Sequence, residues 1–529
     1  LVCRLLPHQI EGLTFLMQRE AKAAGGLLAD DMGLGKTVQT MALLLSNRKQ
    51  DEACIPSTLV VAPLSLMEQW ANEIRSKTNM SVYVHHGPTR KEPRQFANYN
   101  VVLTTYQLLV SEHATPNPDL EIDNDRGIFG VTWYRIVLDE AHTIKNRQAK
   151  MSQAAYKLRA IKRWCLTGTP IQNTAEDLFS LLKFLQIPPL NDYPTFKEKV
   201  SAPVARGKTK LAMQRLGVVL SQIMLRRTKA VLKDGFALPP RTVQHIQVDF
   251  SPAERHFYNG LENRAEAALK RMQSSGEAIG YMSVLVLLQR LRQACNHAQL
   301  VTKELDVSEY RVAAKSEPDN AVDALANLFS GVGMSSRQCA ICLATCSGEH
   351  CDACAAAIQG HLSLSCKLAK LMQLLAMHKG KAILFSQWTS MLDLCAPFLE
   401  ANGIGYVKYY GSMPNKKREA SLATLKADPT CRVLLCSLKA GALGLNLTVA
   451  NLVFMLDVWW NPAIEEQAID RVHRIGQQQE VKVFKLTVRD TVEDRIIALQ
   501  DKKREMAKSA LGEGGKMSRL GMDELLALF

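Results

Sequence analysis

A glycine-rich segment near the start of the chain ends in a lysine followed by a threonine. Residues 25–37 read GGLLADDMGLGKT, and we expect a buried strand to lead into this loop and a helix to follow it. Backbone N–H groups around Gly33 and Gly35, together with the positive end of the helix, can surround phosphate oxygens. Lys36 would neutralise the β- and γ-phosphates, and the Thr37 hydroxyl would ligate Mg²⁺.

One position of this loop departs from the strict phosphate-binding pattern. Asp30 stands where the pattern has glycine, so an ordinary glycine-rich turn between a strand and a helix is the alternative. The order of strand, loop, Gly-Lys-Thr and helix nevertheless favours nucleotide binding. We expect Asp31 to belong to the nucleotide site with the loop glycines.

Two adjacent carboxylates follow a hydrophobic run further along the chain. The segment Tyr134–His142 reads YRIVLDEAH, which predicts a strand ending in Asp139 and Glu140. Ligands bind beyond the carboxyl ends of parallel strands, so Asp139 could hold Mg²⁺ through water. Glu140 is then the candidate to orient and deprotonate the attacking water. Such a pair alone is usually a solvated turn, but downstream of a phosphate loop it indicates triphosphate hydrolysis.

A segment near the end of the chain offers guanidinium groups. Residues 461–476 read NPAIEEQAIDRVHRIG and are expected to form one helix. Gln467, Arg471 and Arg474 would share a face of it, with apolar side chains about a quarter-turn away to pack on a sheet. Arginine keeps its charge and presents a rigid donor fork to a γ-phosphate. A solvated basic face is the alternative, but the upstream loop favours arginines directed at a triphosphate.

Short apolar runs, each followed by a helical stretch, must position these groups. They are Gly26–Ala29, Thr58–Ala62, Val101–Thr105, Tyr134–Leu138 and Trp164–Thr167 in the first half, and Ala382–Phe385, Arg432–Cys436, Asn451–Leu456 and Val481–Leu486 in the second. Such runs are typical of strands buried on both faces of parallel sheets. Because the series stops near Arg226 and resumes near Ala382, we predict an α/β protein with two parallel-sheet lobes.

The predicted domain division follows these runs. It places an ATP-binding lobe at 1–235, a helical protrusion and linker at 236–364 with a cysteine-rich insert at 339–354, a second lobe at 365–500 and a C-terminal helical segment at 501–529. Helical periodicity covers Ser251–Gln273 and Met282–Gln299, whereas Val301–Ser336 is polar and reads as a loop. The charged amphipathic run Glu493–Ala510 is expected to pack against a lobe as a helix.

Composition limits the classes of function. The 529 residues are too many for one core, and 65 Lys+Arg against 51 Asp+Glu leave a net charge of +14. This balance favours an anionic partner such as nucleic acid, with a merely soluble basic surface as the alternative. No run approaches the roughly 18 apolar residues of a membrane span. The start at Leu1 lacks a secretory pattern, and we expect an internal piece of a longer chain.

Taken together, these motifs resemble the Swi/Snf-type ATPases, the double-stranded-DNA translocases of helicase superfamily two. The resemblance runs from Leu5 to about Ile497. The matching segments are Leu6–Gln9, ADDMGLGKT, Val60–Pro63, Leu103–Thr105, LDEAH, LTGTPIQN, Leu225–Lys229, Ile383–Trp388, Ser437–Asn446 and Gln467–Gln477. The family commonly lacks the first loop glycine, so Asp30 also matches.

The resemblance implies two RecA-like lobes with helical protrusions and DNA-stimulated ATP hydrolysis with Mg²⁺. It further implies translocation along duplex DNA, usually without strand separation, in the nucleus, during DNA repair, at replication forks or in chromatin remodelling. Gln9 would read adenine, Gly444 would belong to the nucleotide site, and Arg471 and Arg474 would reach the γ-phosphate in cis. Small, hydroxyl and amide residues of Val60–Pro63, Leu103–Thr105, Ile383–Trp388 and Ser437–Asn446 would contact DNA phosphates. A strand-separating helicase and a scaffold with an idle ATPase are the alternatives.

Two CxxC pairs lie between the predicted lobes. Cys339 and Cys342 are separated from Cys351 and Cys354 by eight residues, a spacing that suits a tetrahedral zinc site. The location resembles the branch that inserts a RING finger there, which includes helicase-like transcription factor and related repair translocases. A RING binds two zinc ions, and its final cysteine pair is absent here. One zinc ion and a loop of unliganded thiols both stay open, and we do not expect a ubiquitin-pathway partner.

Overall fold

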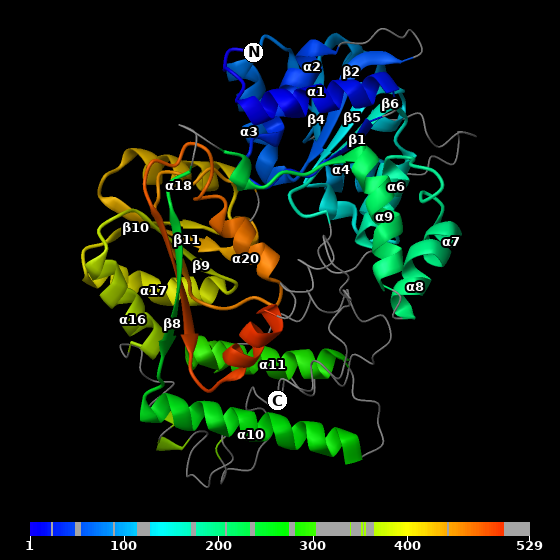
Figure 1. Cartoon of the computed structure of the whole chain (residues 1–529). Coiled ribbons are helices and arrows are strands. Elements are labelled where there is room, and N and C mark those ends of the chain that lie inside the picture. Colours follow the sequence, from blue (N-terminus) through cyan, green and yellow to red (C-terminus); the bar gives the residue numbers. More distant parts are fainter. Residues whose placement is uncertain are drawn as a thin grey trace.

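A computed structural model of the chain describes most of both predicted lobes. The described residues are 1–22, 25–47, 54–87, 90–113, 127–170, 176–206, 209–232, 238–274, 281–302, 339, 351–352, 354–355, 364–441 and 444–501. In Figure 1 the first lobe, blue to cyan, lies above the second, yellow to orange. The predicted class of two parallel-sheet α/β lobes is confirmed.

The first lobe is built on a parallel sheet with the strand order β3-β4-β2-β5-β6-β1-β7. Its strands are β1 (Gly25–Leu28), β2 (Ile55–Ala62), β3 (Val82–Val84), β4 (Val101–Thr105), β5 (Trp133–Asp139), β6 (Ala160–Leu166) and β7 (Met224–Leu225). β1, β4 and β5 are buried along their whole length, as their continuous apolar runs predict. Because β1 and β5 flank β6, the segments that follow these three strands meet at one edge of the sheet.

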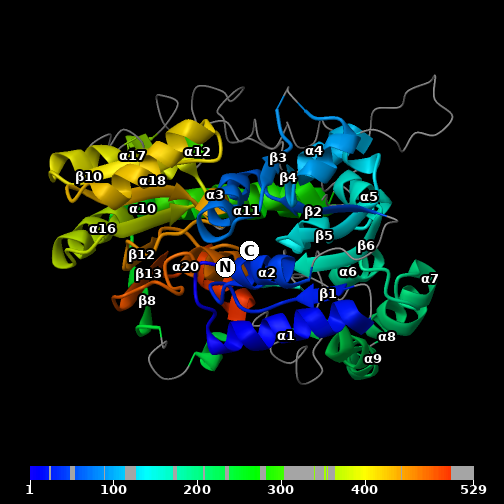
Figure 2. The same ribbon diagram turned by 90° about the horizontal axis from the view of Figure 1, so that it is seen from above.

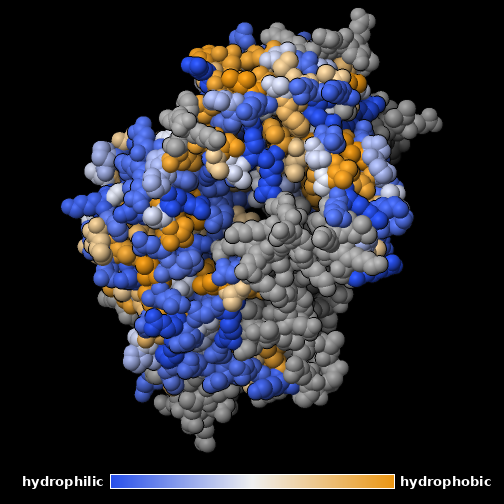
Figure 3. All heavy atoms as spheres, viewed as in Figure 1, coloured by the Kyte–Doolittle hydropathy of each residue, from blue (hydrophilic) through white to orange (hydrophobic). Residues whose placement is uncertain are grey.

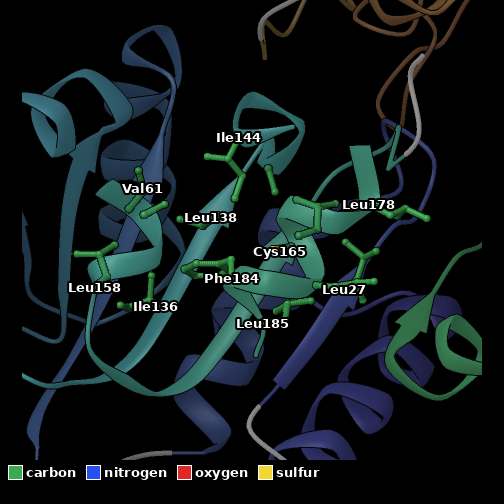
Figure 4. Close-up of a cluster of buried hydrophobic side chains, with 14 of the residues drawn as sticks. Leu27, Val61, Ile136, Leu138, Ile144, Leu158, Cys165, Leu178, Phe184 and Leu185 are labelled. Carbon is green, nitrogen blue, oxygen red and sulfur yellow. The ribbon is translucent and has the colours of Figure 1, made fainter. Parts of the chain in front are cut away.

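Helices cover both faces of this sheet. They are α1 (Pro7–Lys22), α2 (Lys36–Ser46), α3 (Leu64–Lys77), α4 (Tyr106–His113), α5 (Lys150–Lys157), α6 (Asp177–Phe184), α7 (Tyr193–Phe196), α8 (Ala202–Ala205) and α9 (Thr209–Ile223). Figure 4 shows one of the two layers of core, where Leu27 of β1 and Leu138 of β5 pack near Phe184 of α6. This rigid base carries the loops that follow the strands.

The second lobe has a six-stranded parallel sheet with the order β10-β11-β9-β12-β13-β8. Its strands are β8 (Arg241–Val248), β9 (Ala382–Ser386), β10 (Gly405–Tyr409), β11 (Cys431–Ser437), β12 (Leu452–Met455) and β13 (Val481–Val488). Figure 2 shows β8 beside β13 at the edge of this sheet. The expectation that strands stop near Arg226 and resume near Ala382 is therefore wrong, because β8 lies between them in sequence.

The remaining helices are α10 (Pro252–Ser274), α11 (Tyr281–Asn296), α12 (Gln299–Thr302), α16 (Cys366–Met377), α17 (Thr389–Ala401), α18 (Asn415–Ala427), α19 (Leu438–Gly441) and α20 (Pro462–Ile469). α10 and α11 form the predicted helical protrusion, which lies below the second lobe in Figure 1. Residues 492–501 are also helical, and Val492 and Ile496 are buried against α10 and α11. The rest of the predicted Glu493–Ala510 helix lies outside the described residues.

Hydrophilic side chains cover most of the visible face of the second lobe, with smaller hydrophobic areas between them (Figure 3). Among the described helices, none combines the length and apolar character needed to cross a membrane.

Candidate nucleotide site

The glycine-rich loop joins β1 to α2 at the carboxyl ends of the strands of the first sheet. Gly33 and Gly35 have φ angles of +91° and +83°, in the left-handed region that favours glycine. A Cβ atom on Gly33 would lie 2.8 Å from the Cβ of Arg474, and one on Gly35 would lie 2.5 Å from Nε2 of Gln9. Both glycines therefore allow a backbone bend and a close approach, and the approach at Gly33 comes from the second lobe.

Lys36 is the first residue of α2 and points back over the loop. Its Nζ donates to the carbonyl oxygen of Asp30 over 2.6 Å. Burial lowers the pKa of Lys36, an effect that the nearby Glu140 and Asp139 carboxylates oppose. The amine thus lies among carbonyl and carboxylate oxygens, where a phosphate could exchange for the loop carbonyl. Thr37 lines the same cavity.

Gln9 and Asp31 make hydrogen bonds that hold the loop in place. Nε2 of Gln9 donates to the carbonyl oxygen of Leu34 over 3.3 Å, and Asp31 Oδ2 accepts from the backbone N–H of Lys229 over 3.2 Å. Neither side chain lines the cavity that holds Lys36. Both support the loop, and their predicted contact with a nucleotide stays a prediction.

Asp30, the residue that replaces the pattern glycine, is fully buried in an ion pair. Arg227 donates from Nη2 to Asp30 Oδ2 over 2.5 Å and from Nε to Oδ1 over 3.0 Å. Gln39 of α2 donates to the same carboxylate over 3.2 Å. A bidentate guanidinium–carboxylate pair fixes direction as well as distance. Asp30 therefore fastens the start of the loop to the segment that ends the first lobe, a role that the local sequence did not predict.

Asp139 ends β5 with its carboxylate directed into the cavity. Trp70 of α3 donates to Asp139 Oδ2 over 2.7 Å, and the backbone N–H of Glu140 donates to Oδ1 over 2.9 Å. Burial, followed by the charge of Glu140, raises the pKa of Asp139 to about 6. The carboxylate is thus held in place but lacks enough positive charge to offset its desolvation.

Glu140 adopts a left-handed backbone conformation with φ of +47°, which costs free energy in a residue other than glycine. Its Oε1 accepts from Arg471 over 3.2 Å, and its Oε2 lies 3.5 Å from Nδ1 of His142. Burial opposes ionisation of Glu140, but the charges of His142, Arg471 and Lys36 outweigh it and lower the pKa. Among the described residues, Oε2 accepts no hydrogen bond, so an ionised oxygen is left to orient a water molecule.

Three predicted side chains of the second lobe face the first lobe. Gln467 donates from Nε2 to the Thr169 hydroxyl over 3.1 Å, and Arg471 donates to Glu140. Arg474 donates from Nη1 to the Leu445 carbonyl over 3.3 Å, while its buried Nε has no hydrogen-bond partner in the described part of the chain. Burial, aided by the charge of Arg471, lowers the pKa of Arg474. An incompletely paired guanidinium therefore borders the glycine-rich loop.

The predicted single helix over 461–476 is wrong in its second half. α20 ends at Ile469, and the residues after it form turns. The Arg471 carbonyl accepts from Leu447 N–H over 3.0 Å, and the His473 ring contacts the Pro239 carbonyl oxygen at 2.9 Å. These contacts between distant segments replace the next helical turn. The arginines still reach the first lobe, although from a turn.

An ion pair between the lobes escaped the sequence prediction. Lys229, just after Arg227, donates from Nζ to Asp470 Oδ1 and to the His473 carbonyl oxygen, each over 2.6 Å. Burial raises the pKa of Asp470, and Lys229 opposes the rise. The basic segment that ends the first lobe therefore contacts both the glycine-rich loop and the arginine turn. Its unusual run of basic residues was the only signal for this role.

Apart from Gln467, the predicted catalytic and phosphate-binding groups line one cavity of about 60 Å³. Its lining residues are Met32, Gly33, Gly35, Lys36, Thr37, Leu66, Gln69, Trp70, Asp139, Glu140, Gly444, Arg471 and Arg474. Gly444 packs so tightly that a Cβ atom there would lie 1.5 Å from Leu66 of α3. Ligand pockets usually measure about 300–1,000 Å³, so a nucleotide requires the lobes or their side chains to move apart.

The chemistry of two side chains fits a magnesium ion. Asp139 forms no ion pair with any described residue although its carboxylate is buried, and Thr37 lies across the same cavity. Carboxylate and hydroxyl oxygens suit Mg²⁺, which would also supply the positive charge that Asp139 lacks.

Some hydroxyls expected to contact DNA are already used inside the protein. The Thr104 hydroxyl donates to the His85 carbonyl, the Thr105 hydroxyl accepts from Leu108 N–H, and Ser386 donates to Asp457. All three side chains are buried, so the expectation that they contact DNA phosphates does not hold in this arrangement. In the second lobe, Asn446 remains exposed.

The predicted cysteine site is described only in part. Cys342 lies outside the described residues, and Cys339 is buried in the core of the helical protrusion. Cys351 and Cys354 lie instead beside His256 of α10, a residue that the spacing of the cysteines could not indicate.

Comparison with protein families gives two matches along the chain. The model of the SNF2-related domain matches residues 8–300, and that of the helicase conserved C-terminal domain matches residues 366–476. The first match covers the first lobe and continues through β8, α10 and α11, and the second match falls on the second lobe.

Several curated relatives align with nearly the whole chain. An uncharacterised ATP-dependent helicase of Schizosaccharomyces pombe is 34% identical, with 100% of this chain and 62% of the relative covered. DNA repair protein RAD5A of Arabidopsis thaliana is 34% identical, with 96% and 60% covered. Helicase-like transcription factor CHR27 of Arabidopsis thaliana is 30% identical, with 99% and 73% covered. The chain thus spans less than two thirds of the first two relatives.

A solved structure, the Sulfolobus solfataricus SWI2/SNF2 ATPase core in complex with dsDNA, also matches. The two sequences are 27% identical, the aligned region covers 97% of this chain and 94% of the chain in the solved structure, and the TM-score is 0.40. This score is too low to support an argument.

Proposed function

The chain belongs to the SNF2-related family, and from this membership we propose that it is a DNA-dependent ATPase that translocates along duplex DNA. One observation carries the proposal: Arg471 of the second lobe meets Glu140 of the first over 3.2 Å, beside Lys36 and Asp139. Groups for phosphate binding, water activation and charge stabilisation thus come from both lobes. Such a site couples hydrolysis to relative movement of the lobes.

We assign roles to the first-lobe residues by their chemistry. Lys36 and the N–H groups of the loop bind the β- and γ-phosphates, and Thr37 and Asp139 would hold Mg²⁺, which would supply positive charge next to the phosphates. Glu140 orients a water molecule through Oε2 and takes its proton. The low pKa of Glu140 keeps this base ionised at neutral pH.

The second lobe completes the site. Arg471 leaves Glu140 when a γ-phosphate enters, and Arg474 uses its incompletely paired guanidinium on the same group. The hydrogen bond from Gln467 to Thr169, which follows β6, joins the two lobes and therefore depends on whether the cleft between them is open or closed. Because phosphate and base compete for Arg471, nucleotide binding changes the contact between the lobes.

The proposed cofactors are ATP and Mg²⁺, and the proposed partner is double-stranded DNA. The net charge of +14 supports an anionic partner. Relatives named for DNA repair and as a helicase-like transcription factor support a nuclear role in repair or chromatin. We keep the division at 1–235, 236–364, 365–500 and 501–529, except that β8 pairs with the second sheet.

The decisive experiment measures ATP turnover without nucleic acid and with single-stranded DNA, duplex DNA or nucleosomes. We expect duplex to stimulate turnover most among the naked DNAs and Lys36→Ala to abolish it, with exposed Lys22→Ala as the matched control. Unchanged duplex-stimulated turnover in Lys36→Ala would refute the assignment. A strand-displacement assay on a forked duplex tests the helicase alternative. Robust unwinding in this assay would show a strand-separating helicase and would overturn the proposal of translocation without strand separation.

A further inference from the structure

Trp70 of α3 makes a short hydrogen bond to the predicted magnesium ligand. Its indole Nε1–H donates to Asp139 Oδ2 over 2.7 Å, and both side chains are buried. This length is typical of a donor bound to an ionised carboxylate. We propose that Trp70 is a positioning residue for the reaction, because its N–H fixes the direction in which Asp139 presents its carboxylate to a metal ion. This role rests on the proposed function, which assigns Asp139 to Mg²⁺.

The backbone of Asp139 is held independently of this bond. β5 lies between β2 and β6 in the sheet, and the buried Tyr106 hydroxyl donates to the Asp139 carbonyl oxygen over 2.7 Å. The remaining freedom is that of the side chain, whose Oδ1 accepts from the Glu140 N–H over 2.9 Å and whose Oδ2 accepts from Trp70. Loss of the indole N–H would therefore leave the backbone in place and let the carboxylate turn about its one remaining hydrogen bond.

The donors that hold the Asp139 carboxylate are neutral, unlike the guanidinium that pairs with Asp30. Arg227 offsets the charge of Asp30 in a bidentate ion pair. Within the described part of the chain, the Asp139 carboxylate accepts from an indole and a backbone amide and has no ion-pair partner. Neutral donors fix a carboxylate without cancelling its charge. Since a carboxylate has about four lone-pair sites, each oxygen also keeps one for a cation.

The helix that carries Trp70 also touches the second lobe. Leu66 lies one helical turn before Trp70, and both side chains line the nucleotide cavity. A Cβ atom on Gly444 of the second lobe would lie 1.5 Å from Leu66. Because residues four positions apart share a face of a helix, the same face of α3 meets Gly444 and Asp139. In Figure 1, α3 lies on the side of the first lobe that is near the second.

A purely structural role for Trp70 is the competing interpretation. A buried tryptophan usually finds an acceptor for its N–H, and Asp139 would then serve only as that acceptor. Trp133 is such a case, because its Nε1–H donates to the Ile128 carbonyl oxygen over 2.9 Å within the core of the lobe. Trp133 begins the strand that Asp139 ends. It therefore offers a matched control, since its replacement removes a buried indole and its hydrogen bond away from the nucleotide cavity.

The test compares the wild type, Trp70→Phe and Trp133→Phe in the whole chain with saturating duplex DNA. Turnover is measured at saturating ATP over a range of free Mg²⁺ concentrations. Trp70→Phe should raise the Mg²⁺ concentration for half-maximal turnover about 10–100-fold, the range typical of losing an outer-shell partner, while kcat at saturating Mg²⁺ stays near the wild-type value. Trp133→Phe should keep the wild-type Mg²⁺ dependence even if thermal unfolding shows that it is less stable.

A binding measurement supplies a readout other than turnover. The affinity for a non-hydrolysable fluorescent ATP analogue is measured with Mg²⁺ and with EDTA. Because coupling between two ligands is reciprocal, a weaker metal site reduces the gain in nucleotide affinity that Mg²⁺ gives. This gain should fall about 10–100-fold in Trp70→Phe and stay at the wild-type value in Trp133→Phe.

A second replacement at position 70 separates the N–H from the ring. Benzothienylalanine, introduced by nonsense suppression, keeps the fused ring and has sulfur in place of N–H, so it preserves the packing better than Phe. It should reproduce both effects of Trp70→Phe. A wild-type Mg²⁺ dependence with either replacement, whether or not kcat is lower, would overturn the proposal.

Asp139→Asn distinguishes failure of this role from failure of the proposed function. The variant should lose most of the gain in nucleotide affinity that Mg²⁺ gives. If it keeps the wild-type gain, the assignment of Asp139 to Mg²⁺ is wrong, and the role of Trp70 is refuted with it. If it loses the gain while Trp70→Phe keeps it, only the role of Trp70 is refuted.

Discussion

Arg471 donates from Nη2 to Glu140 Oε1 over 3.2 Å, so the expected γ-phosphate cation is paired with the expected catalytic base. Both side chains are at least nine-tenths buried. A buried ion pair of this kind contributes little net free energy to folding, because the cost of desolvating both charges offsets most of their attraction. We therefore propose that a triphosphate displaces Glu140 from Arg471, and that this exchange would free the base when its substrate binds.

Arg471→Ala tests this exchange. Turnover with saturating duplex DNA should fall by roughly 10³-fold, the lower end of what an arginine finger contributes. DNA affinity, measured by fluorescence anisotropy, should change little because Arg471 faces the cleft. Arg489→Ala is the matched control, since Arg489 makes an exposed ion pair with Asp249. Near wild-type turnover in Arg471→Ala would remove the finger role.

Glu140→Gln should separate binding from hydrolysis. The amide keeps the shape of the side chain but cannot take a proton, so ATP should bind normally while turnover falls about 10²–10⁴-fold. Binding of a fluorescent ATP analogue and steady-state hydrolysis measure the two steps. Exposed Glu92→Gln should match the wild type in both. If Glu140→Gln instead loses nucleotide affinity, Glu140 supports the loop and is not the base.

The chemistry of the first lobe could be predicted because it lies in short local patterns. Lys36 and Thr37 are adjacent before a helical stretch, and Asp139 and Glu140 end one apolar run, so the sequence alone places the first pair at a helix start and the second at a strand end. The contacts that connect these patterns could not be predicted. Arg227 and Asp30 are 197 positions apart, and Lys229 and Asp470 are 241.

The limits on the fold have the same physical origin. β8 escaped prediction because it is an edge strand, exposed along most of its length, without the apolar run of a central strand. The pattern of 461–476 suits a helix, but α20 ends at Ile469, and the residues after it contact Leu447 through the Arg471 carbonyl and Pro239 through the His473 ring. Local periodicity shows which face of a helix or strand can be buried, but it does not show which distant segment packs against that face.

Turnover should also depend on pH through Asp139. Burial and the charge of Glu140 raise its pKa to about 6, so the carboxylate is ionised above pH 6 and becomes protonated as pH falls through 6. Protonation removes the proposed Mg²⁺ ligand, and kcat/KM should fall tenfold per pH unit below about 6. A profile that stays flat down to pH 5 would contradict this role.

Stability should move in the opposite direction over this range. The folded-state pKa of Asp139 lies above the usual value of about 3.9, so ionising it costs folding free energy above pH 6. This cost shrinks as pH falls from 6 toward 4. Thermal unfolding measured alongside turnover thus distinguishes protonation of the site from acid unfolding.

Asp30→Gly would create the strict phosphate-loop pattern, and we expect it to damage the protein. The substitution removes the buried carboxylate from the Arg227 guanidinium and leaves only the exposed Glu11 carboxylate 3.6 Å away, so the free energy of unfolding should fall by up to about 3–5 kcal/mol. Urea unfolding of the nucleotide-free chain measures the loss.

Adding Arg227→Met to the Asp30→Gly chain removes the guanidinium charge and should restore part of the lost stability, with a coupling energy above about 1 kcal/mol in the double-mutant cycle. Additive losses, or a single variant as stable as the wild type, would mean that Asp30 and Arg227 act independently. Turnover of the double variant is the further readout: if the pair transmits the state of the loop to the end of the first lobe, activity should remain low although stability recovers.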